Sequence, residues 1–451
     1  MTALVLPKPA EPVLPTDRWF PRGYQRAAWS ALEGGCKRLV WVWHRRAGKD
    51  TMGLRWVAQA MLDRVGVYWH VLPTLRQGRR IIWNGRTKEG VPFLSAFPSE
   101  LVVKQREDEM YIGYANGSIY QVVGSDNIDA LVGANPIGVI MSEYPLQDPA
   151  AWDLIRPILA ENEGWAIFPY TPRGHNHGWR LFKMARTNPK WFCQLLRAGD
   201  TEALPPGAIQ DEIDAGMTEA LAAQEFDCSF DVPVEGAYYG REMMAADKEG
   251  RICEVPHEPD LPVDTWWDLG VGDANAIWFV QRLGPQYRVI NYIEESGYGL
   301  PWYIKEMRRL GDDDGYIYGE HIAPHDINVR ELGSGERAIS RKETARRLGV
   351  TFRVAPKAAN ESQIQDQRDK VRAKLPLCWF DVHKCARGID ALRNYRKEED
   401  ESKSDGVVTY YKEHHRHDWA SHGADAFRTG IAGGGRSGTT EKPKPPRLDI
   451  V

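Results

Sequence analysis

Residues 44–51 carry the chemistry of a phosphate-binding loop, since they read His-Arg-Arg-Ala-Gly-Lys-Asp-Thr. In such a loop, backbone N–H groups, here including those of Ala47 and Gly48, cradle phosphate oxygens together with the N-terminus of the following helix. Lys49 would reach the β and γ phosphates of a nucleotide. A Gly-Lys turn that only closes a strand is the alternative. The apolar strand before it and the helix-forming run after it favour the phosphate loop.

Three charged side chains near this loop are candidates for hydrolysis of the nucleotide. Arg45 or Arg46 would neutralise the charge that develops on the transferred phosphate, as an arginine finger supplied by the same chain. Glu143 follows the apolar run 137–141, which is where P-loop enzymes carry the glutamate that polarises the attacking water. We therefore expect ATP hydrolysis at this loop.

The magnesium ligands of this site depart from the usual P-loop pattern in two complementary places. Asp50 occupies the position that usually offers a Ser or Thr hydroxyl, and Ser142 stands where an acid is usual. We expect that the two positions have exchanged ligand types, so that the loop supplies the carboxylate and the strand supplies the hydroxyl. The alternative is that Asp50 caps the following helix and Thr51 binds the metal.

Two further positions suit the recognition of ATP. Tyr24 and Gln25 lie shortly before the first strand, where an aromatic–Gln pair reads adenine through its amide and favours ATP over GTP. Thr171 follows the apolar run 165–170 and is placed to sense the γ-phosphate. A solvated helix start and an ordinary Pro-Arg-Gly turn are the alternatives.

Three aspartates later in the chain form a second candidate site. Asp268 closes one strand pattern, Asp326 follows another, and Asp425 lies on a helical pattern. Carboxylates from two strand ends and a helix can hold divalent ions that activate water against a phosphodiester. Because these ligands are hard oxygens, Mg²⁺ or Mn²⁺ is expected. Taken singly, each aspartate could instead cap a turn, start a helix or face solvent.

Helical spacing separates the roles of the acids near the C-terminal end. Asp418, His422 and Asp425 fall on one helix face, because steps of three, four and seven residues align. Asp418 is expected to cap a helix that begins at Trp419, which leaves Asp425 for the metal. Glu294 is a candidate fourth acid. The histidines of this region lack the partners that a zinc site needs.

The apolar runs that must position these residues fall into two sets. In the first, strand patterns alternate with amphipathic stretches, which predicts a parallel sheet covered by helices. These patterns lie at 38–43, 67–72, 137–141 and 165–170. In the second, the strand patterns are close enough for an antiparallel meander followed by helices. They lie at 265–268, 276–281 and 287–293.

The two sets predict two α/β domains in a chain of 451 residues, which is longer than one compact core usually becomes. We expect a P-loop ATPase domain at 19–204 and a second domain at 256–432. Residues 205–255 are expected to form a linker with two short helices. Segment 1–18 is expected to be extended, and the tail 433–451 to be disordered.

The composition narrows the class of protein. The chain has 42% hydrophobic and 27% charged residues and a net charge of −4, so nucleic-acid contacts must come from local basic patches. Candidate patches are Arg76 with Arg79 and Arg80, and residues 341–347, although a solvated helix face explains either equally well. No membrane span or secretion signal is expected. The six cysteines have no metal-ligand spacing, which suits reduced thiols.

Taken in order over residues 19–431, these motifs resemble those of the large terminase subunit of tailed double-stranded DNA bacteriophages. The resemblance implies a RecA-like P-loop ATPase domain followed by an RNase H-like nuclease domain. It assigns Lys49 to the phosphates, Glu143 to catalysis and Thr171 to coupling. It assigns the three aspartates to the nuclease metals. His44 and Ser142 depart from the family pattern and affect the expected Mg²⁺ coordination.

The resemblance also implies a viral DNA-packaging motor. ATP hydrolysis would drive double-stranded DNA into a procapsid, and a metal-dependent endonuclease would cut concatemeric DNA. The expected partners are the DNA, the procapsid portal protein, the small terminase subunit and further copies in a ring of five. Such a motor works in the host cytoplasm, docks transiently on the procapsid and is absent from the mature virion.

Two other functions are compatible with the same residues. A helicase-nuclease of DNA repair would use a similar motor to unwind strands. A regulatory protein with a degenerate ATP site would explain the unusual Asp50 and Ser142.

Overall fold

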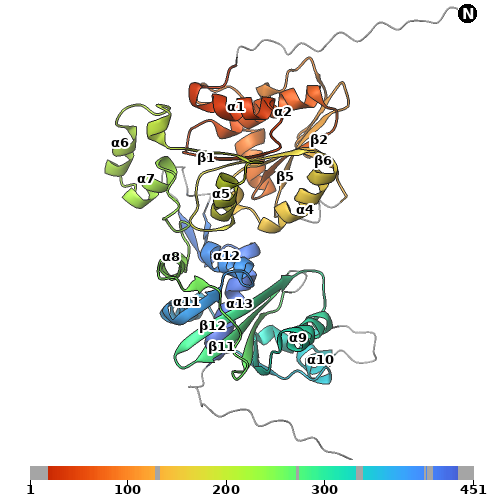
Figure 1. Ribbon diagram of the computed structural model, residues 1–451, viewed down its shortest axis with the longest axis vertical. Helices are drawn as coiled ribbons and strands as arrows, with labels where there is room; N and C mark the ends of the chain where they lie inside the picture. Colours follow the sequence, from red (N-terminus) through yellow and green to blue (C-terminus); the bar gives the residue numbers. More distant parts are fainter. Residues whose placement is uncertain are drawn as a thin grey trace, which may run out of the picture. The chain divides into compact units, whose positions relative to one another are not determined.

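The computed structural model describes residues 19–126, 133–270, 274–331, 339–400, 403 and 410–434. Its contacts divide the chain into a first unit, Met1–Val232, and a second unit, Pro233–Val451 (Figure 1). The linker predicted at 205–255 is therefore divided between the two units. The predicted segment 1–18 and residues 435–451 of the predicted tail lie outside the described residues, whereas Gly433 ends a helix.

An eight-stranded sheet forms the centre of the first unit, in the order β3-β4-β5-β2-β6-β7-β1-β8. The neighbours from β5 to β8 in this order are parallel, and β3 and β4 extend the edge in antiparallel pairs. The strands are β1 (Arg38–Trp43), β2 (Val67–Leu72), β3 (Val102–Arg106), β4 (Tyr111–Tyr114), β5 (Ile119–Gly124), β6 (Pro136–Met141), β7 (Trp165–Tyr170) and β8 (Phe192–Leu196).

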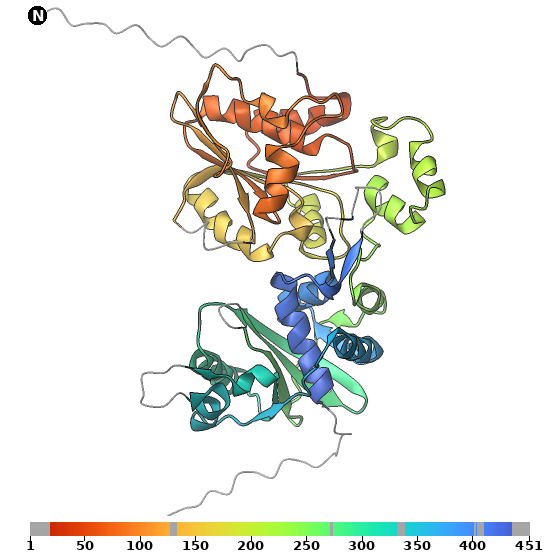
Figure 2. The same ribbon diagram turned by 180° about the vertical axis from the view of Figure 1, so that it is seen from behind.

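Helices cover both faces of this sheet. Figures 1 and 2 show α1 and α2 on one face and α4 and α5 on the other. The helices are α1 (Arg26–Glu33), α2 (Lys49–Asp63), α3 (Leu75–Gly78), α4 (Pro149–Glu161), α5 (His177–Thr187), α6 (Ala208–Asp214) and α7 (Glu219–Phe226).

Strand β1 shows why the sequence folds this way. Side chains alternate between the two faces of a strand, so Leu39, Trp41 and Trp43 enter the core beneath α1 and α2. Val40 and Val42 enter the core on the side of α4 and α5. Burial on both faces explains the uninterrupted apolar run and confirms the predicted parallel sheet covered by helices.

The central strand order is that of a RecA-like core. In the order β8-β1-β7-β6-β2, strand β7 separates β1, which leads into the phosphate loop, from β6, which leads to Glu143. The predicted RecA-like fold is therefore confirmed. The predicted bounds match β1, β2 and β7, and β6 begins one residue earlier than predicted, at Pro136.

A seven-stranded sheet forms the centre of the second unit, in the order β16-β13-β10-β11-β12-β17-β9. The strands are β9 (Ile252–Cys253), β10 (Val263–Asp268), β11 (Asn275–Leu283), β12 (Gln286–Glu295), β13 (Tyr318–Ala323), β16 (Phe352–Val354) and β17 (Cys378–Asp381). Two further pairs join β14 (Arg330–Glu331) with β15 (Ile339–Ser340), and β18 (Lys397–Glu399) with β19 (Tyr411–His415).

The topology of this sheet is RNase H-like, as predicted. Strands β10, β11 and β12 form an antiparallel meander, and β13 adds in parallel to the free edge of β10, with β16 beyond it. The carboxyl ends of β10 and β13 consequently lie at the same edge of the sheet. This arrangement brings the chain segments that carry Asp268 and Asp326 to that edge.

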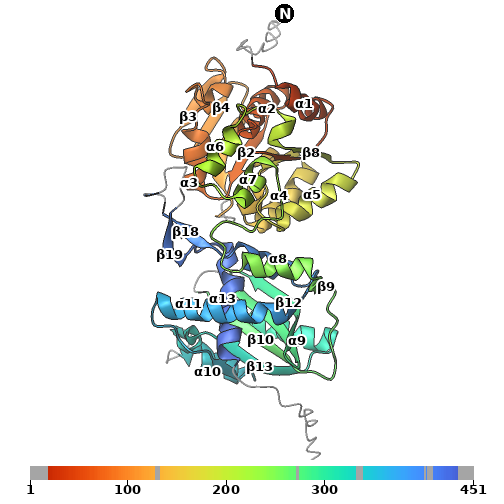
Figure 3. The same cartoon turned by 90° about the vertical axis from the view of Figure 1, so that its left-hand side faces the viewer.

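Helices also cover both faces of the second sheet. Trp266 and Trp278 face the core under α12 and α13, whereas Trp267 and Phe279 face the core under α9 and α10. Figure 3 shows α8, α11 and α13 in front of the sheet. The helices are α8 (Gly240–Lys248), α9 (Leu300–Asp314), α10 (Arg341–Arg347), α11 (Glu361–Lys374), α12 (Ala386–Asn394) and α13 (Trp419–Gly433). None of the described helices combines the length and the apolar character needed to span a membrane.

Candidate nucleotide and nuclease sites

The phosphate loop turns sharply between β1 and α2. Gly48 has a φ of 77° and Arg46 a φ of 71°, both in the left-handed region. Lys49 is the first residue of α2, and its buried ammonium donates three hydrogen bonds. These reach the carbonyl oxygens of Trp43 (3.1 Å) and His44 (3.3 Å) and Oγ1 of Thr171 (2.9 Å). The structure thus brings together two predicted site residues, Lys49 and Thr171, which follow neighbouring strands of the sheet.

Asp50 and Ser142 also meet, although they are 92 residues apart in the sequence. The Ser142 hydroxyl donates a hydrogen bond of 2.6 Å to Oδ1 of Asp50. The N-cap of α2 is Gly48, and Asp50 lies inside the first turn of the helix. Asp50 is therefore not the capping residue. A carboxylate and a hydroxyl at one point are the hard oxygen donors that Mg²⁺ prefers, so this pair fits the expected magnesium site.

A buried histidine, His70, lies close to the Asp50 carboxylate. His70 is completely buried, and burial lowers its pKa to about 4, so the ring is neutral at pH 7. Its Nδ1 lies 3.1 Å from the Tyr120 hydroxyl, and its Nε2 lies 3.8 Å from Oδ1 of Asp50. If the tyrosine donates to Nδ1, the single ring proton sits on Nε2 and faces the Asp50 carboxylate. No sequence pattern predicted this Tyr120–His70–Asp50 row.

Glu143 follows β6 in a strained conformation. Its φ is 55°, in the left-handed region, and its N–H donates to the carbonyl of Pro169 at the end of β7. Its Oε2 is buried and accepts no hydrogen bond from any described residue. Burial raises the pKa of Glu143, while Lys49 and Arg173 act in the opposite direction. A carboxylate held with an open oxygen and a raised pKa suits the activation of a water molecule.

Helix α7 contributes a residue that the sequence analysis missed. The Glu225 carboxylate is buried and pairs with the guanidinium groups of Arg173 and Arg45. Its backbone carbonyl also accepts a hydrogen bond of 2.8 Å from the N–H of Arg45. Arg45 and Arg46, the two candidate fingers, are both exposed on the loop, and Arg45 differs by its contacts with Glu225. The structure therefore distinguishes the two arginines by their surroundings.

The unusual His44 braces the loop through its side chain. The ring is buried, and its Nδ1 lies 2.6 Å from the carbonyl of Arg45 while its Nε2 lies 2.7 Å from Oγ1 of Thr201. Burial lowers the pKa of His44, which favours the neutral ring. A small residue could not make these bonds, which accounts for a histidine at this place.

Tyr24 and Gln25 contact the same loop. The Gln25 amide donates to the Ala47 carbonyl (2.9 Å) and accepts from the N–H of Arg22 (3.0 Å). The Tyr24 hydroxyl donates to the same Ala47 carbonyl (3.2 Å). Both side chains therefore support the loop, and their recognition of adenine stays a prediction. Thr51 lies half-buried in the first turn of α2.

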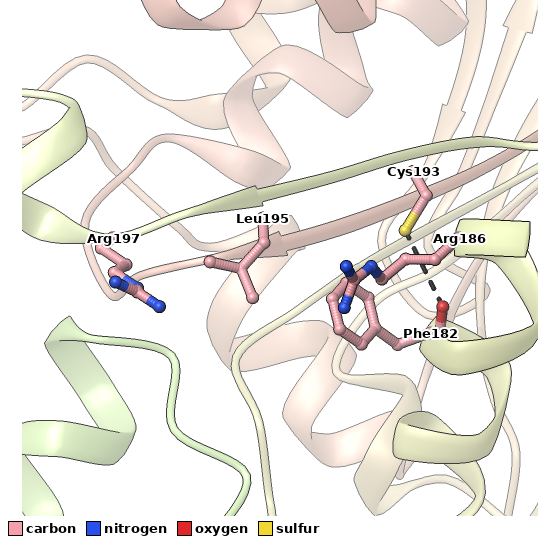
Figure 4. A pocket seen from close by; sticks show the side chains of 5 residues that line it. All are labelled: Phe182, Arg186, Cys193, Leu195 and Arg197. Atoms are coloured by element: carbon pink, nitrogen blue, oxygen red, sulfur yellow. Dashed lines mark hydrogen bonds between the residues drawn. The ribbon is translucent and has the colours of Figure 1, made fainter.

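A separate hollow of about 290 Å³ lies beside β8 (Figure 4). Phe182 and Arg186 of α5 stack against each other there, opposite Cys193. Burial raises the pKa of Cys193 to about 11, so this thiol stays protonated at pH 7. None of the predicted site residues lines this hollow.

Two of the three predicted nuclease aspartates interact across β10 and α13. Asp268 ends β10, and its Oδ2 lies 3.5 Å from Nδ1 of His422 on α13. Burial raises the pKa of Asp268, and the nearby Asp425 carboxylate acts in the same direction. For Asp425, burial acts against ionisation, but Arg428 and His415 outweigh it and the pKa is lowered. The two carboxylates thus share one electrostatic environment, which raises the pKa of Asp268 and lowers the pKa of Asp425.

Asp425 has several partners. Its Oδ1 accepts hydrogen bonds from Nε (3.2 Å) and a terminal nitrogen (3.0 Å) of Arg428 and from the Tyr395 hydroxyl (3.2 Å). Its Oδ2 lies 3.7 Å from Nε2 of His415. Asp418 is the N-cap of α13 and accepts from the N–H of Ala420, which confirms the role predicted for it.

Asp326 is placed differently. It lies in a 3-10 turn, His325–Asn328, and is 43% exposed, with its carboxylate 3.2 Å from Nε2 of His325. Within the described parts of the chain, no three His, Cys, Asp or Glu side chains are gathered to hold a metal ion. The carboxylates of Asp268 and Asp425 suit a hard cation, but the predicted three-ligand set is not assembled among these residues.

Glu294, the candidate fourth acid, is paired with an arginine and a tyrosine. It lies across β11 from Asp268, because Asp268 pairs with Ala276 and Ala276 with Glu294. Its Oε1 accepts from Arg387 (2.8 Å), and the Tyr292 hydroxyl donates to Oε2. These contacts give Glu294 a structural role, although it lies in line with Asp268 across the three strands.

No protein-family model and no curated protein sequence match this chain. Among solved structures, the large terminase of bacteriophage HK97 is 11% identical, with 91% of this chain and 94% of that chain covered and a TM-score of 0.43. The large terminase of a thermophilic bacteriophage, in complex with ADP, is 13% identical, with 91% and 96% covered and a TM-score of 0.39. The large terminase ATPase domain of Thermus phage P74-26 is 21% identical, with 47% and 94% covered and a TM-score of 0.39. The chain is similar to these large terminases at low identity, so its site assignments depend on its own side-chain contacts.

Proposed function

We propose that this chain is an ATP-hydrolysing motor that moves double-stranded DNA into a procapsid and cuts it. One observation carries the ATPase part of the proposal. Lys49 with Thr171, and Asp50 with Ser142, converge around a single loop at the edge of a RecA-like sheet. Glu143 and Arg173 lie within the same electrostatic cluster. This set supplies phosphate binding, metal binding and water activation at one place.

The residues divide the work of hydrolysis. Lys49 exchanges hydrogen bonds with backbone carbonyls for bonds to the β and γ phosphates, and Arg45 stabilises the charge that develops on the γ-phosphate. Asp50 and Ser142 would hold Mg²⁺, which neutralises phosphate charge when bound. Glu143 orients a water molecule and takes its proton. Thr171, bonded to Lys49 before nucleotide binds, responds when the lysine turns to the phosphates.

The proposed ATPase is tested by DNA-stimulated ATP hydrolysis. Wild-type protein should hydrolyse ATP faster when linear duplex DNA is added, and Lys49→Ala should abolish hydrolysis. Lys88→Ala is the matched control, because Lys88 is 79% exposed and outside the site. Equal hydrolysis by wild type and Lys49→Ala would contradict the proposal. An inactive wild type would favour the regulatory protein with a degenerate ATP site.

We also propose that the second unit cuts DNA with Mg²⁺ or Mn²⁺ held by Asp268 and Asp425, without Asp326 as a third ligand. The electrostatic interaction between Asp268, at the end of β10, and Asp425, on α13, supports this assignment. Plasmid digestion in Mn²⁺ should be lost in Asp268→Asn and kept in Asp312→Asn, which changes an exposed acid on α9. Equal digestion by the two variants would remove the nuclease from the proposal.

The packaging role and the partners of the motor rest on the resemblance of the motif order. They comprise the portal protein, the small terminase subunit, a ring of five copies and a transient position on the procapsid in the host cytoplasm. A strand-displacement assay separates this role from a helicase-nuclease of DNA repair. A packaging motor leaves the duplex intact, and release of a labelled strand would favour the helicase.

A further inference from the structure

The two edges of the first sheet differ in how they are protected. Strand β3 forms one edge, and it carries Lys104 and Arg106 and a shift of register against β4. Charges and irregular pairing of this kind keep an edge strand from pairing with other chains. Strand β8 forms the other edge, reads Phe-Cys-Gln-Leu-Leu without a charge or a proline, and pairs with β1 in an unbroken register. The edge at β8 therefore lacks the features that block further strand pairing.

The outer edge of β8 presents the backbone groups of Cys193 and Leu195. The carbonyl of Leu196 accepts a hydrogen bond from the N–H of His44, so it points toward the chain of β1. In a parallel pair, the N–H and C=O of one residue point to one side and those of the next residue to the other. The backbone groups of Cys193 and Leu195 consequently point away from β1, where the sheet has no further strand among the described residues.

The hollow beside this edge is suited to a single apolar side chain. It is lined by Cys193, Leu195 and Arg197 of the β8 segment and by Phe182 and Arg186 of α5 (Figure 4). Its volume of about 290 Å³ is several times the ~30 Å³ that one water molecule occupies in the liquid. It is also just below the roughly 300 to 1,000 Å³ of small-molecule pockets. An amino-acid side chain therefore fits it better than a large cofactor does.

Two exposed arginines stand at opposite ends of the hollow. Figure 4 shows Leu195 between Arg186 and Arg197. Neither arginine forms an ion pair with any residue that the structure describes. The surrounding stretch, residues 164–199, contains six Lys and Arg residues and no Asp or Glu, although the whole chain has a net charge of −4. This positive surface is complementary to an acidic partner.

The spacing along β8 defines the sequence of such a partner. Arg197 continues the extended backbone of β8, with a φ of −87° and a ψ of 163°, so Cys193, Leu195 and Arg197 lie on one face. Arg186 lies beside Cys193, and the span from Cys193 to Arg197 is about 13 Å at about 3.3 Å per residue. A partner strand matches this span when an acid, an apolar residue and a second acid occupy alternate positions.

We propose that the outer edge of β8 and its hollow bind an extended segment of a partner protein that carries the pattern acid–x–apolar–x–acid. The segment adds to the sheet as a further strand, its apolar side chain enters the hollow, and its carboxylates pair with Arg186 and Arg197. A DNA duplex fits this surface less well. Its phosphates suit the arginines, but it supplies neither an extended peptide backbone for β8 nor an apolar side chain for the hollow. The inference goes beyond the proposed function and does not depend on ATP hydrolysis.

Fluorescence anisotropy of labelled peptides, with the full chain, tests this proposal. Arg186→Ala and Arg197→Ala should each weaken binding of a peptide with the core Glu-Thr-Leu-Thr-Glu by roughly two- to fivefold, as expected for an exposed ion pair. The isomer Thr-Glu-Leu-Glu-Thr has the same composition, but its acids face away from its leucine. It should bind roughly 4- to 25-fold more weakly, since both ion pairs are lost. Arg156→Ala, at a 61% exposed arginine of α4, is the matched control.

Methylation of the peptide amides separates strand addition from simple attraction of charge. Methyl groups on one set of alternate amides should abolish binding, and methyl groups on the other set should not, because only one set faces β8. Equal binding by the two methylated peptides, equal binding by the two isomers, or no binding by the first peptide would overturn the proposal. Displacement of the peptide by duplex DNA, with equal losses of DNA and peptide affinity in both arginine variants, would overturn it in favour of a phosphate-binding surface.

Discussion

The exchange of ligand types between Asp50 and Ser142 predicts an unusual pattern of mutant effects. In a standard P-loop, the residue after the lysine supplies a hydroxyl to Mg²⁺. If Thr51 supplied that hydroxyl here, the Asp50 carboxylate would be dispensable for metal binding. Here Asp50 accepts a 2.6 Å hydrogen bond from Ser142 and has His70 behind it. Asp50→Ala removes the carboxylate and leaves the Ser142 hydroxyl without its acceptor. Thr51→Ala removes a hydroxyl that makes none of these contacts.

The size of the effect follows from the contacts that are lost. A hydrogen bond to a charged group contributes about 1.5 to 3 kcal/mol. Since 1.4 kcal/mol corresponds to a tenfold change, the Mg²⁺ concentration that half-activates ATP hydrolysis should rise roughly 10- to 100-fold in Asp50→Ala. The direct loss of a metal carboxylate adds to this figure. Thr51→Ala should change the requirement for Mg²⁺ by less than about threefold.

The assay is a titration of Mg²⁺ at saturating ATP for wild type and both variants. Asp50→Asn separates charge from shape, because the amide still accepts from Ser142 while the negative charge is lost. It should also raise the Mg²⁺ requirement, but by less than Asp50→Ala, because the hydrogen bond from Ser142 is kept. Normal hydrolysis by Asp50→Ala together with a large effect of Thr51→Ala would refute the exchange and restore the ordinary assignment.

Three further predictions concern the buried polar groups. Glu143→Gln should lower kcat for ATP about 100- to 10,000-fold with little change in ATP binding, because the open carboxylate oxygen is the base; a normal kcat would remove that role. Tyr120→Phe should raise the Mg²⁺ requirement roughly tenfold, since His70 loses the donor that fixes its proton; an unchanged titration would exclude the Tyr120–His70–Asp50 row from metal binding. Burial lowers the pKa of His321 to about 4. Its folded pKa lies below its unfolded pKa of about 6.5, so the free energy of unfolding of the second unit should fall as pH drops from about 6.5 to 4, by at most about 3 kcal/mol. Thermal melts of His321→Asn should lack this part of the pH dependence, and identical pH profiles would contradict it.

Elements determined by local pattern were predictable from the sequence. Strands β1, β2 and β7 are buried on both faces, so their apolar runs end where the strands end. The N-cap of α13 was predictable because Asp418 bonds to a residue two positions later. The edge strand β3 was not predicted, because its side chains are exposed or half-buried and form no apolar run, and β4 was not predicted because it has only four residues, one of them glycine.

Residues whose role depends on distant partners were missed. Glu225 lies 52 residues from Arg173, and His44 lies 157 residues from Thr201. Neither pairing leaves a periodic pattern, so Glu225 was assigned to a linker and His44 was noted only as a departure. For His70, the fold alone brings Tyr120 and Asp50 to its two ring nitrogens. Such contacts depend on the order of the strands in the sheet. The sequence predicts the class of fold, but it does not predict which distant side chains that order brings together.

The central claim is that Lys49 and its loop enclose the phosphates of ATP. Calorimetric titration of Mg²⁺–ATP into the Glu143→Gln protein, which should bind without hydrolysis, measures this directly when Lys49→Ala and Lys88→Ala are made in the same background. The account predicts that Lys49→Ala weakens binding by roughly tenfold or more, as expected for a lost charge-assisted contact, and that Lys88→Ala has no effect. Equal affinity in all three proteins would contradict it.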